Sequence, residues 1–572
     1  MTLARALGAK LRALPSTLFR KAPTCSQDHR WTALLRADCY DLAAAALFTT
    51  LFVLVATTFR DYAISNDEEV QQQYGGLIIA YYASGLTDQA LFHFRDLYLY
   101  GGLFDIVAIG LQKILPLDPY QVRHLLSALT GVGGIGAAWA AARMIGGSRA
   151  GLLAATALAV CGIWYGAMFA HTKDIPFAAA MMGASYVLLR LSRELPRPRW
   201  SLVLAFGVLS GCALGIRVLG LFALGYAAFA VVICAPISGG DWRRLSAFVT
   251  RSAMRLVPAF LIAYVIMIAA WPWAGLAPLN PLRAVYLFDH FHYPISTILD
   301  GHVYYMADVP RWYVPVYIGI KLTLPLLIGA GLGLLLATLP HAASNAAANT
   351  WRREAVLMAL ATLFPLLCDV IANAPGDTGM RHFLFTAPPI AVLAGLGLDG
   401  GLRRLQAFHP LAGLTGGATV LLALTFNATT LYRLHPDEYL FFNPLVGGLE
   451  GASRRYATDY WVNIMPEAVS DLERYLDRSG DPLGKRPLQH YSVAVCGERL
   501  PFEKTADARL QFTRDWRHAD FFIAPTHMNC DRALNGRIIA KVERLGVMIG
   551  VVKDRRSLAG PTLAHNGANE IR

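Results

Sequence analysis

The sequence predicts an α-helical polytopic membrane protein that carries a small α/β domain at its C-terminal end. Of the 572 residues, 55% are hydrophobic and only 16% are charged, whereas soluble chains have about 25% charged residues. Apolar runs long enough to cross a hydrocarbon core of about 30 Å recur throughout residues 42–427. From residue 428 onward, shorter segments of mixed polarity replace them.

The N-terminal segment, residues 1–41, is basic and is broken by polar residues. No small-residue cleavage site follows an apolar core, so we expect a cytoplasmic segment and a retained first span rather than a cleaved signal peptide. The net charge of +12 is also typical of nucleic-acid-binding proteins, but basic cytoplasmic loops explain it in a membrane protein. We therefore expect membrane lipids, and no nucleic acid, as partners.

Eleven spans account best for the apolar runs in the predicted transmembrane domain, residues 42–427. The predicted spans are 42–59, 124–142, 150–169, 175–190, 201–216, 219–236, 256–273, 314–338, 355–372, 383–398 and 411–427. This number places every arginine-rich connecting segment on the side of the basic N-terminus, as the positive-inside rule requires. The first external loop, 60–123, and the region after residue 427 then lie outside. We interpret 102–115 as an interfacial or re-entrant helix, since a span there would reverse every later loop.

The C-terminal region, 428–572, is predicted to form the external α/β domain. The expected elements are helices at 466–478 and 537–545 and strands at 491–495, 521–524 and 547–552. Cys496 and Cys530 lie beside such strands in an oxidising compartment, so we expect a disulfide between them, the alternative being two unpaired thiols.

The first candidate catalytic residues are the acids directly after the first span, in Ser65-Asn66-Asp67-Glu68-Glu69. Acids stabilise a helix N-terminus, and a solvated helix start is the simpler interpretation. A carboxylate that opens a semi-buried external segment beside apolar helices is also suited to act as a general base. Both interpretations stay open on the residues alone, as does the choice between Asp67 and Glu68.

The second candidate is His171-Thr172-Lys173-Asp174-Ile175-Pro176, between two predicted spans on the outer side. Basic residues are scarce on that side, and charges held against an apolar bundle are usually functional. A lysine ammonium is suited to bind a phosphate, with Asp174 orienting the lysine or the substrate. The alternative is a local pair of Lys173 and Asp174 at the start of the next helix.

Arg217 and Arg381 also lie at external span ends. Together with Lys173 they supply the positive charge that an anionic lipid phosphate needs, while the simpler explanation for each is snorkelling toward headgroups. His382 follows Arg381 directly, and we assign it, with His171, to a polar acceptor pocket.

The external segment Asp289-His290-Phe291-His292 contains possible metal ligands. Two histidines and one aspartate are too few for a zinc site. We assign His290 and His292 to the polar acceptor pocket and expect no cofactor, with a divalent metal as the less favoured alternative. The sequence has no P-loop, dinucleotide fingerprint, serine nucleophile elbow or nucleic-acid module, so a soluble nucleotide donor is not indicated.

Three of these segments resemble motifs of the GT-C superfamily of lipid-linked-sugar glycosyltransferases, in the branch of the aminoarabinose transferase of lipid A and the protein O-mannosyltransferases. Asn66-Asp67-Glu68 is similar to the acidic pair that opens the family's first external loop, and the segment 171–176 resembles its second acidic motif. Arg381-His382-Phe383-Leu384-Phe385-Thr386-Ala387-Pro388-Pro389 resembles the segment that opens a late span. The segments 436–448 and 459–461 resemble uncharacterised bacterial members of the branch. The likeness covers roughly residues 40–465.

The resemblance implies a polyprenyl-phosphate-linked sugar as donor and an inverting transfer to an extracytoplasmic lipid, polysaccharide or protein. It implies the outer face of a bacterial inner membrane, with a periplasmic C-terminal domain. Asp67 would deprotonate the acceptor, and Glu68 and Asp174 are the other candidate catalytic acids. The residues that would stabilise the departing lipid phosphate are Lys173, Arg381 and Arg217.

The chain departs from the aminoarabinose branch in one respect. That branch carries a lysine in a Lys-Pro-Pro segment of the first external loop, and the segment is missing here. His93, Arg95 and Lys113 are candidate substitutes, which leaves the donor sugar open. Two alternatives belong to other classes: a non-catalytic membrane scaffold, and a transporter of lipid-linked sugars, which predicts charges deep within spans and an internal repeat.

Overall fold

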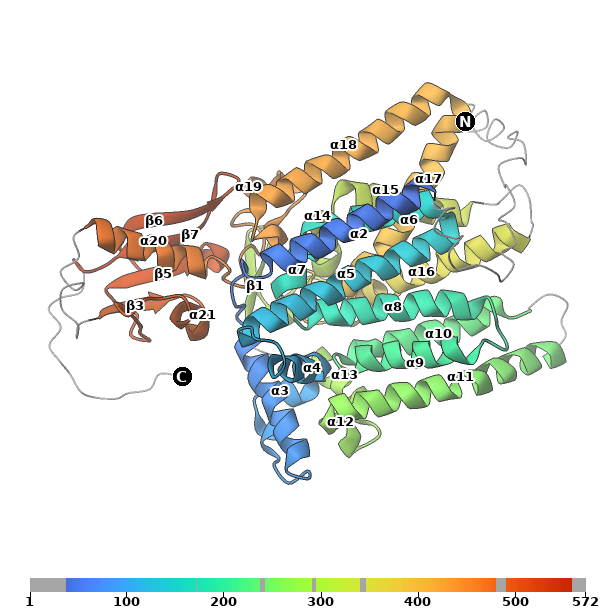
Figure 1. Cartoon of the computed structure of the whole chain (residues 1–572), viewed down its shortest axis with the longest axis horizontal. Helices are drawn as coiled ribbons and strands as arrows, with labels where there is room; N and C mark the ends of the chain where they lie inside the picture. The colour runs from blue at the N-terminus through green and yellow to red at the C-terminus, as the bar shows by residue number, and fades with distance from the viewer. Residues whose placement is uncertain are drawn as a thin grey trace.

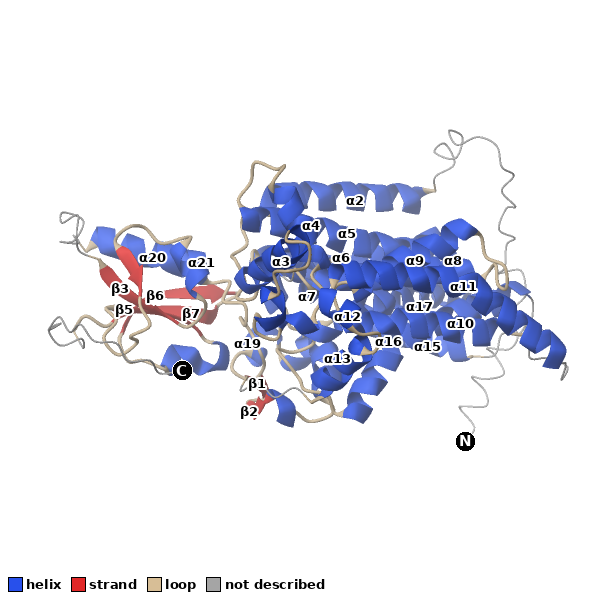
Figure 2. Ribbon diagram, turned by 90° about the horizontal axis from the view of Figure 1, so that it is seen from below, coloured by secondary structure: helices blue, strands red, loops and turns tan. Residues whose placement is uncertain are grey.

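The computed structural model describes residues 38–170, 172–236, 242–290, 295–339, 346–479 and 490–557. It consists of a long helical body and an α/β domain that projects from one end of that body (Figure 1). Figure 2 shows the same division from another side, with the large sheet outside the helical body. The predicted fold class, an α-helical polytopic membrane protein with a small C-terminal α/β domain, is confirmed.

The helical body is built from a long succession of helices with short connections. In chain order its α-helices are α2 (Cys39–Thr58), α3 (Glu68–Ala83), α4 (Leu103–Gln112), α5 (Pro119–Gly146), α6 (Ser148–Ala159), α7 (Gly162–Ala170), α8 (Asp174–Ser192), α9 (Trp200–Leu214), α10 (Leu221–Cys234), α11 (Trp242–Ala270), α12 (Pro272–Leu276), α13 (Asn280–Asp289), α14 (Tyr313–Lys321), α15 (Leu324–Thr338), α16 (Ala346–Ala372), α17 (Ala387–Phe408), α18 (Pro410–Leu434) and α19 (Gly448–Ala452). The connections include a hairpin of β1 (Ser296–Leu299) and β2 (His302–Tyr305) and the 3-10 helices η3 (Ala90–His93), η4 (Leu97–Leu99), η5 (Val218–Gly220), η6 (Met306–Asp308), η7 (Arg381–Thr386), η8 (Glu438–Leu440) and η9 (Pro444–Val446).

Within the described part of the chain, seven helices are long and apolar enough to cross a membrane, or nine spans if two bent pairs each count as one. The bent pairs are α6 with α7, at 62°, and α14 with α15, at 114°. Helices of this length and composition identify a membrane-embedded protein. The eleven predicted spans also include the shorter helices α9 and α10, and that number stays a prediction.

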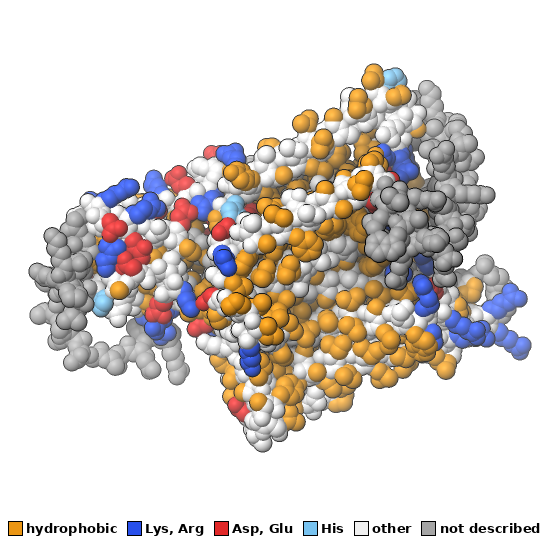
Figure 3. Space-filling view, viewed as in Figure 1, with side chains coloured by type: hydrophobic (Ala, Val, Ile, Leu, Met, Phe, Trp, Pro, Cys, Tyr) orange, Lys and Arg blue, Asp and Glu red, His pale blue; other side chains and the backbone are white. Residues whose placement is uncertain are grey.

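The surface of the body is divided along its length. Figure 3 shows hydrophobic side chains over the helices between the two ends, and Lys and Arg side chains gathered at the end far from the α/β domain. Helix α5 has Arg143 in its last turn and helix α8 has Arg190. Helix α17 carries Arg403 and Arg404 near its C-terminus. The body therefore has one arginine-rich end, and the α/β domain lies at the other.

Helix α17 lies at the centre of the body and determines where the residues before it are placed. Its N-terminal half is almost completely buried. Its contact with α15 is made by glycines, since a Cβ atom on Gly397 would lie 1.9 Å from the carbonyl oxygen of Gly329. Small residues let membrane helices approach this closely. Because η7 runs directly into α17, this packing positions Arg381, which lies against Trp461, four residues before α20 begins.

The segment between α2 and α5 lies at the end of the body nearest the α/β domain, as α3, two 3-10 helices and α4 (Figure 1). Helix α4 has 10 residues, about half the length that a membrane span requires, so it is suited to lie at the interface. Helices α3 and α4 pack tightly, because a Cβ atom on Gly75 would lie 2.7 Å from the Cβ atom of Asp105. This packing helps to position the residues that open α3 at that end of the body.

The α/β domain contains a five-stranded sheet with helix α20 against it. The elements are α20 (Met465–Arg478), β3 (Tyr491–Val495), α21 (Arg499–Glu503), β4 (Leu510–Phe512), β5 (Phe521–Pro525), the 3-10 helix η11 (His527–Arg532), β6 (Arg537–Arg544) and β7 (Val547–Asp554). The strand order is β4-β3-β5-β7-β6, with β3 parallel to β4 and β5, and β7 antiparallel to β5 and β6. Cys496, directly after β3, forms a disulfide with Cys530 of η11.

The prediction of a helix over 537–545 is wrong, because this segment forms strand β6. It pairs with β7 through the tight turn Leu545-Gly546, where both residues have positive φ angles of 49° and 77°. Two adjacent residues with positive φ form the type of turn that suits the twist of a β-hairpin. The charged side chains of β6 lie on an exposed edge strand, which made the segment resemble a polar helix.

A buried polar cluster joins the α/β domain to the helical body. Arg544 of β6 reaches Asp437, just after α18, with a distance of 2.8 Å between Nε and Oδ2. The same arginine bonds Glu467 of α20 at 2.6 Å. Nearby, the Tyr439 hydroxyl donates to the buried carboxylate of Asp459. These bonds hold the domain against the end of the body at which α5, α8 and α17 begin.

Candidate active site

Arg381 lies at the centre of an ionic cluster at this end of the body. Its Nε donates to Oδ2 of Asp174 at 3.0 Å, and a second guanidinium nitrogen bonds Asp67. The third nitrogen lies 3.8 Å from Asp377. The guanidinium also lies 4.2 Å from the ring centroid of Trp461. Four segments that are distant in sequence thus meet around one arginine with a side chain that is only 10% exposed.

Two further cations lie behind this arginine. Arg217 forms an ion pair with Asp174, so that this one buried carboxylate bridges Arg217 and Arg381. Lys173 lies with its Nζ 4.1 Å from the ring centroid of Tyr100, and the Arg217 guanidinium lies 5.8 Å from the same centroid. Burial, with a smaller contribution from Arg217, lowers the pKa of Lys173 to about 8. The site therefore gathers three cationic side chains, two of them over the Tyr100 ring and the third, Arg381, over the Trp461 ring.

The three acids of the cluster differ in their exposure. The side chain of Asp67 is 41% exposed, whereas that of Asp174 is 2% and that of Asp377 is 16% exposed. Asp67 occupies the N-cap position of α3 but makes no capping hydrogen bond with its side chain. Burial raises the pKa of Asp377, an effect that Arg381 opposes. Asp67 is therefore the carboxylate of the cluster that a molecule approaching from outside can best reach.

Glu68 belongs to a different, closed cluster, although it is the next residue in the chain. Its Oε2 accepts hydrogen bonds from the backbone N–H of Ser65 at 2.8 Å and from His124 at 3.0 Å. Its Oε1 lies 3.8 Å from the guanidinium of Arg123, which bonds Asp105 at 2.8 Å. Both the Glu68 and the Arg123 side chains are completely buried. This geometry separates the two acids that the sequence left equal: Asp67 faces the cations, and Glu68 faces the interior.

The predicted histidines are spread over several places. His382 lies beside the cluster, with its Nε2 3.8 Å from Asp377. His290 lies at the C-terminal end of α13, where its ring stacks on that of Tyr286 at 4.2 Å and its Nδ1 lies 3.7 Å from Asp289. His171 and His292 lie outside the described residues. The described ranges hold no group of three His, Cys, Asp or Glu side chains arranged to bind a metal ion.

Sequence reasoning missed several members of the two clusters. They are Tyr100, Asp105, Arg123, His124, Asp377 and Trp461. Trp461 contacts Arg381 from a distant part of the chain, and no local pattern identifies it as a partner. Asp377, in contrast, lies only four residues before Arg381. Arg123 was also missed, although the signal was present. It is a charged residue at the outer end of a predicted span, the same exception to the positive-inside rule that identified Arg217 and Arg381.

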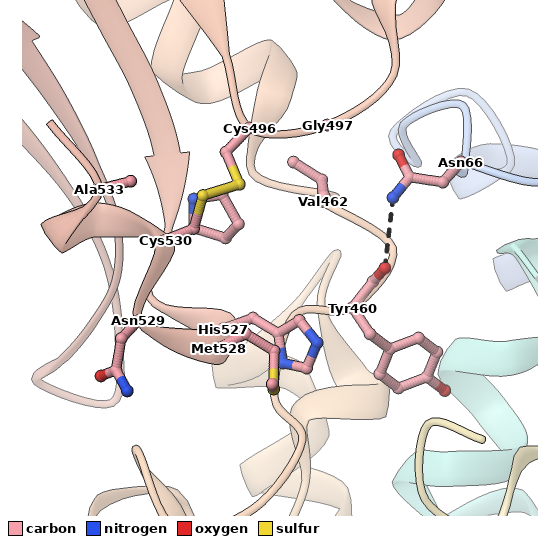
Figure 4. A pocket seen from close by; sticks show the side chains of 11 residues that line it. Asn66, Tyr460, Val462, Cys496, Gly497, His527, Met528, Asn529, Cys530 and Ala533 are labelled. Carbon is pink, nitrogen blue, oxygen red and sulfur yellow. Dashed lines mark hydrogen bonds between the residues drawn. A yellow bond between two sulfur atoms is a disulfide. The ribbon is translucent and has the colours of Figure 1, made fainter. Parts of the chain in front are cut away.

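A cavity of about 390 Å³ adjoins the ionic cluster, between the α/β domain and the end of the body (Figure 4). Its lining residues come from both parts of the chain. They are Asn66, Tyr460, Val462, Cys496, Gly497, Pro525, His527, Met528, Asn529, Cys530 and Ala533. On one side of the cavity, the amide of Asn66 donates to the carbonyl of Tyr460 at 3.4 Å.

No protein family model and no curated protein matches the chain. Among solved structures, it is similar to ArnT from Cupriavidus metallidurans bound to undecaprenyl phosphate, with 15% identity over 91% of this chain and 99% of that one, at a TM-score of 0.47. It is also similar to the apo oligosaccharyltransferase of Archaeoglobus fulgidus, with 14% identity over 84% of this chain and 65% of that one, at a TM-score of 0.45. The complex of the oligosaccharyltransferase AglB, from the same organism, with an inhibitory peptide and a dolichol-phosphate matches with 13% identity over 85% and 70% of the two chains, at a TM-score of 0.42.

Proposed function

We propose that this protein is an inverting glycosyltransferase that moves a sugar from a polyprenyl-phosphate carrier to a hydroxyl group of an acceptor outside the cytoplasm. The observation that carries the proposal is the pairing of a half-exposed carboxylate, Asp67, with the buried arginine Arg381, beside two further cations. Such a site combines a base with positive charge for a departing phosphate. These are the two functions that the reaction requires.

The phosphate of the donor would bind at Arg381, with Arg217 and Lys173 as the further positive charges. A planar guanidinium binds phosphate oxygens in pairs, and a lysine ammonium adds a point charge. Asp67 and Asp174 both bond Arg381 in the structure, so a phosphate that binds this guanidinium in pairs competes with one of them. Asp67 is the one that is exposed, so donor binding releases it and leaves Asp174 in place.

The released carboxylate of Asp67 would then accept the proton of the acceptor hydroxyl. The acceptor oxygen forms a bond to the anomeric carbon from the face opposite the phosphate, and the bond between that carbon and the phosphate oxygen breaks. The electron pair of this bond stays with the polyprenyl phosphate, whose negative charge increases in the transition state. Arg381, Arg217 and Lys173 stabilise that charge.

The site belongs on the outer face of the membrane in this proposal. The site and the α/β domain lie at the end of the body opposite to its arginine-rich end. Under the positive-inside rule, the arginine-rich end faces the cytoplasm. A bacterial inner membrane, with the α/β domain in the periplasm, fits this orientation and the implied polyprenyl carrier.

The test is transfer by the full chain in lipid vesicles, with radiolabelled polyprenyl-phosphate sugars as donors and a cell-envelope extract as the source of acceptor. We expect label to reach an acceptor with the natural protein and not with Asp67→Asn. Undecaprenyl phosphate should bind the variant at least as tightly as the natural protein, since Arg381 loses a competing carboxylate. The matched control is Asp88→Asn, which changes an exposed acid of the same external segment. Equal transfer by Asp67→Asn and the natural protein would contradict the proposal.

A further inference from the structure

The cavity beside the disulfide and the ionic cluster share two stretches of chain. Asn66 lines the cavity, and the next residue, Asp67, contacts Arg381. Tyr460 lines the cavity, and the next residue, Trp461, lies against the same arginine. The two sites are therefore neighbours. In both stretches, one residue lines the cavity and the next residue contacts Arg381. Asp67 does not line the cavity itself, and its carboxylate bonds Arg381 in the neighbouring cluster.

The lining of the cavity carries no charged side chain. Its polar side chains are Asn66, Tyr460, His527 and Asn529. The Asn66 amide donates to the Tyr460 carbonyl and accepts from the Glu498 N–H, and the Asn529 oxygen accepts from Arg454. Amides, the phenol and the imidazole can each donate and accept hydrogen bonds. Nδ1 of His527 is buried and has no hydrogen-bond partner in the described part of the chain. Burial lowers the pKa of His527 to about 4, so the ring is neutral at pH 7. The Tyr460 and His527 rings, 6.4 Å apart, add aromatic surface.

The wall of the cavity is held in a strained conformation. Val462, Met528 and Asn529 all line it, and all have positive φ angles, of 56°, 52° and 57°. Such conformations are costly for residues other than glycine and are concentrated at binding sites. The disulfide between Cys496 and Cys530 constrains this wall. Two hydrogen bonds from Arg454 to Asp531, at 3.2 and 2.8 Å, constrain it further.

We propose that this cavity binds an uncharged carbohydrate unit of the acceptor and presents one of its hydroxyl groups to Asp67. This inference rests on the proposed function for the role of the ligand, but not for the existence of the site. Sugar hydroxyls donate and accept hydrogen bonds, as the amides and the imidazole do, and sugar C–H faces pack on aromatic rings. A volume of about 390 Å³ lies at the lower end of small-molecule sites, which suits one or two sugar units.

The lining favours a carbohydrate over a charged lipid headgroup or a peptide. A phosphorylated headgroup requires cations, and none lines the cavity. An extended peptide requires a free strand edge or a row of backbone groups. The only strand that contributes to the lining, β5, is the central strand of the sheet, and its lining residue, Pro525, is paired with Gly550 of β7 and has no backbone N–H to offer.

The test is direct binding to the full chain in lipid nanodiscs, measured by saturation-transfer NMR. The probes are methyl glycosides of glucose and of N-acetylglucosamine, with the tripeptide Ala-Ser-Ala as the peptide comparison. Two variants alter the cavity. His527→Phe keeps the ring and removes its nitrogens, and Ala533→Phe fills space at the lining. The matched control is His518→Phe, because His518 is an exposed histidine of the same domain outside the lining.

We expect the natural protein and the control to give saccharide signals, and both cavity variants to bind the saccharide about tenfold more weakly. Equal signals from the natural protein and Ala533→Phe, no saccharide signal at all, or a stronger signal from the peptide would each overturn the inference. Undecaprenyl phosphate binding is measured in the same samples. If a protein binds saccharide in the cavity but not undecaprenyl phosphate, the cavity site stands and the proposed function fails. If the reverse holds, only the cavity site fails.

Discussion

Asp67 and Glu68 are adjacent in the chain, yet they belong to two clusters with opposite properties. Around Glu68, both the acid and its arginine partner, Arg123, are completely buried. Around Asp67, the arginine is buried but the acid is 41% exposed. An ion pair that is closed on all sides can only support the fold, because no other partner can reach it. An ion pair with one exposed member can exchange that member for a ligand.

The largest expected effect comes from removing Arg381, the cation that Asp67 and Asp174 share. Arg381→Ala should lower transfer by about 10³-fold and weaken undecaprenyl phosphate binding by tenfold or more, since buried charge that stabilises a leaving group contributes on this scale. The measurements are initial transfer rates and binding titrations in vesicles. Arg311→Ala, which changes an exposed arginine of another external segment, is the control. A variant with normal phosphate binding would show that Arg381 only supports the fold.

A substitution in the closed cluster, around Glu68 and Arg123, should lower the stability of the protein rather than its rate of sugar transfer. Glu68→Gln leaves Arg123 buried without its full counter-charge, and breaking a buried ion pair costs roughly 3 kcal/mol. We expect a clear fall in the Tm of the detergent-solubilised protein. The protein that remains folded should transfer sugar at a rate close to normal. Asp67→Asn should give the opposite result, with normal Tm and no transfer. The comparison fails if both variants lose the same property.

A smaller effect should appear in the pH dependence of donor binding. Because the pKa of Lys173 is lowered to about 8, chiefly by burial, the side chain is charged at pH 7 and neutral above pH 9. Undecaprenyl phosphate binding should therefore weaken as the pH rises from 7 to 9.5. Lys173→Met should bind more weakly at pH 7 and show no such dependence. An unchanged pH profile in this variant would exclude Lys173 from the phosphate site.

The smallest effect concerns the junction between α18 and the external face. His435 hydrogen-bonds Glu438 at 2.8 Å and Asp61 at 3.1 Å, and the bond to Glu438 is the main reason why its pKa is raised. The folded state thus binds this proton more tightly than the unfolded state. The stabilisation is fully present below the ordinary histidine pKa of about 6.5 and is lost as the pH rises through the raised value.

We expect the Tm of the natural protein to fall by a few degrees between pH 6 and pH 8.5, and that of His435→Gln to fall less. His490→Gln is the matched control, because this exposed histidine bonds the backbone carbonyl of Ala508 rather than a carboxylate. If His435→Gln and the natural protein lose equal stability over this range, the titrating group lies elsewhere.

Much of the site could be predicted, because the distribution of basic residues in a membrane protein indicates which loops share one side of the membrane. Lys173, Arg217 and Arg381 are cations at the outer ends of apolar segments, where basic residues are rare, and they proved to lie together. The same logic would have identified Arg123. It could not have identified Trp461 as the ring beneath Arg381, because that contact joins residues of the body and of the connection to the α/β domain.

The sequence by itself determined the membrane character, the C-terminal α/β domain, the cysteine pair and the set of unusual external charges. These follow from composition and from the position of charges along apolar runs, which are local properties of the chain. Tertiary structure alone decided which of Asp67 and Glu68 faces the cations, that 537–545 is a strand, and that a neutral cavity lies beside the ionic cluster. Each of these depends on which distant segments bury a residue, and burial is a property of the packed molecule rather than of any segment.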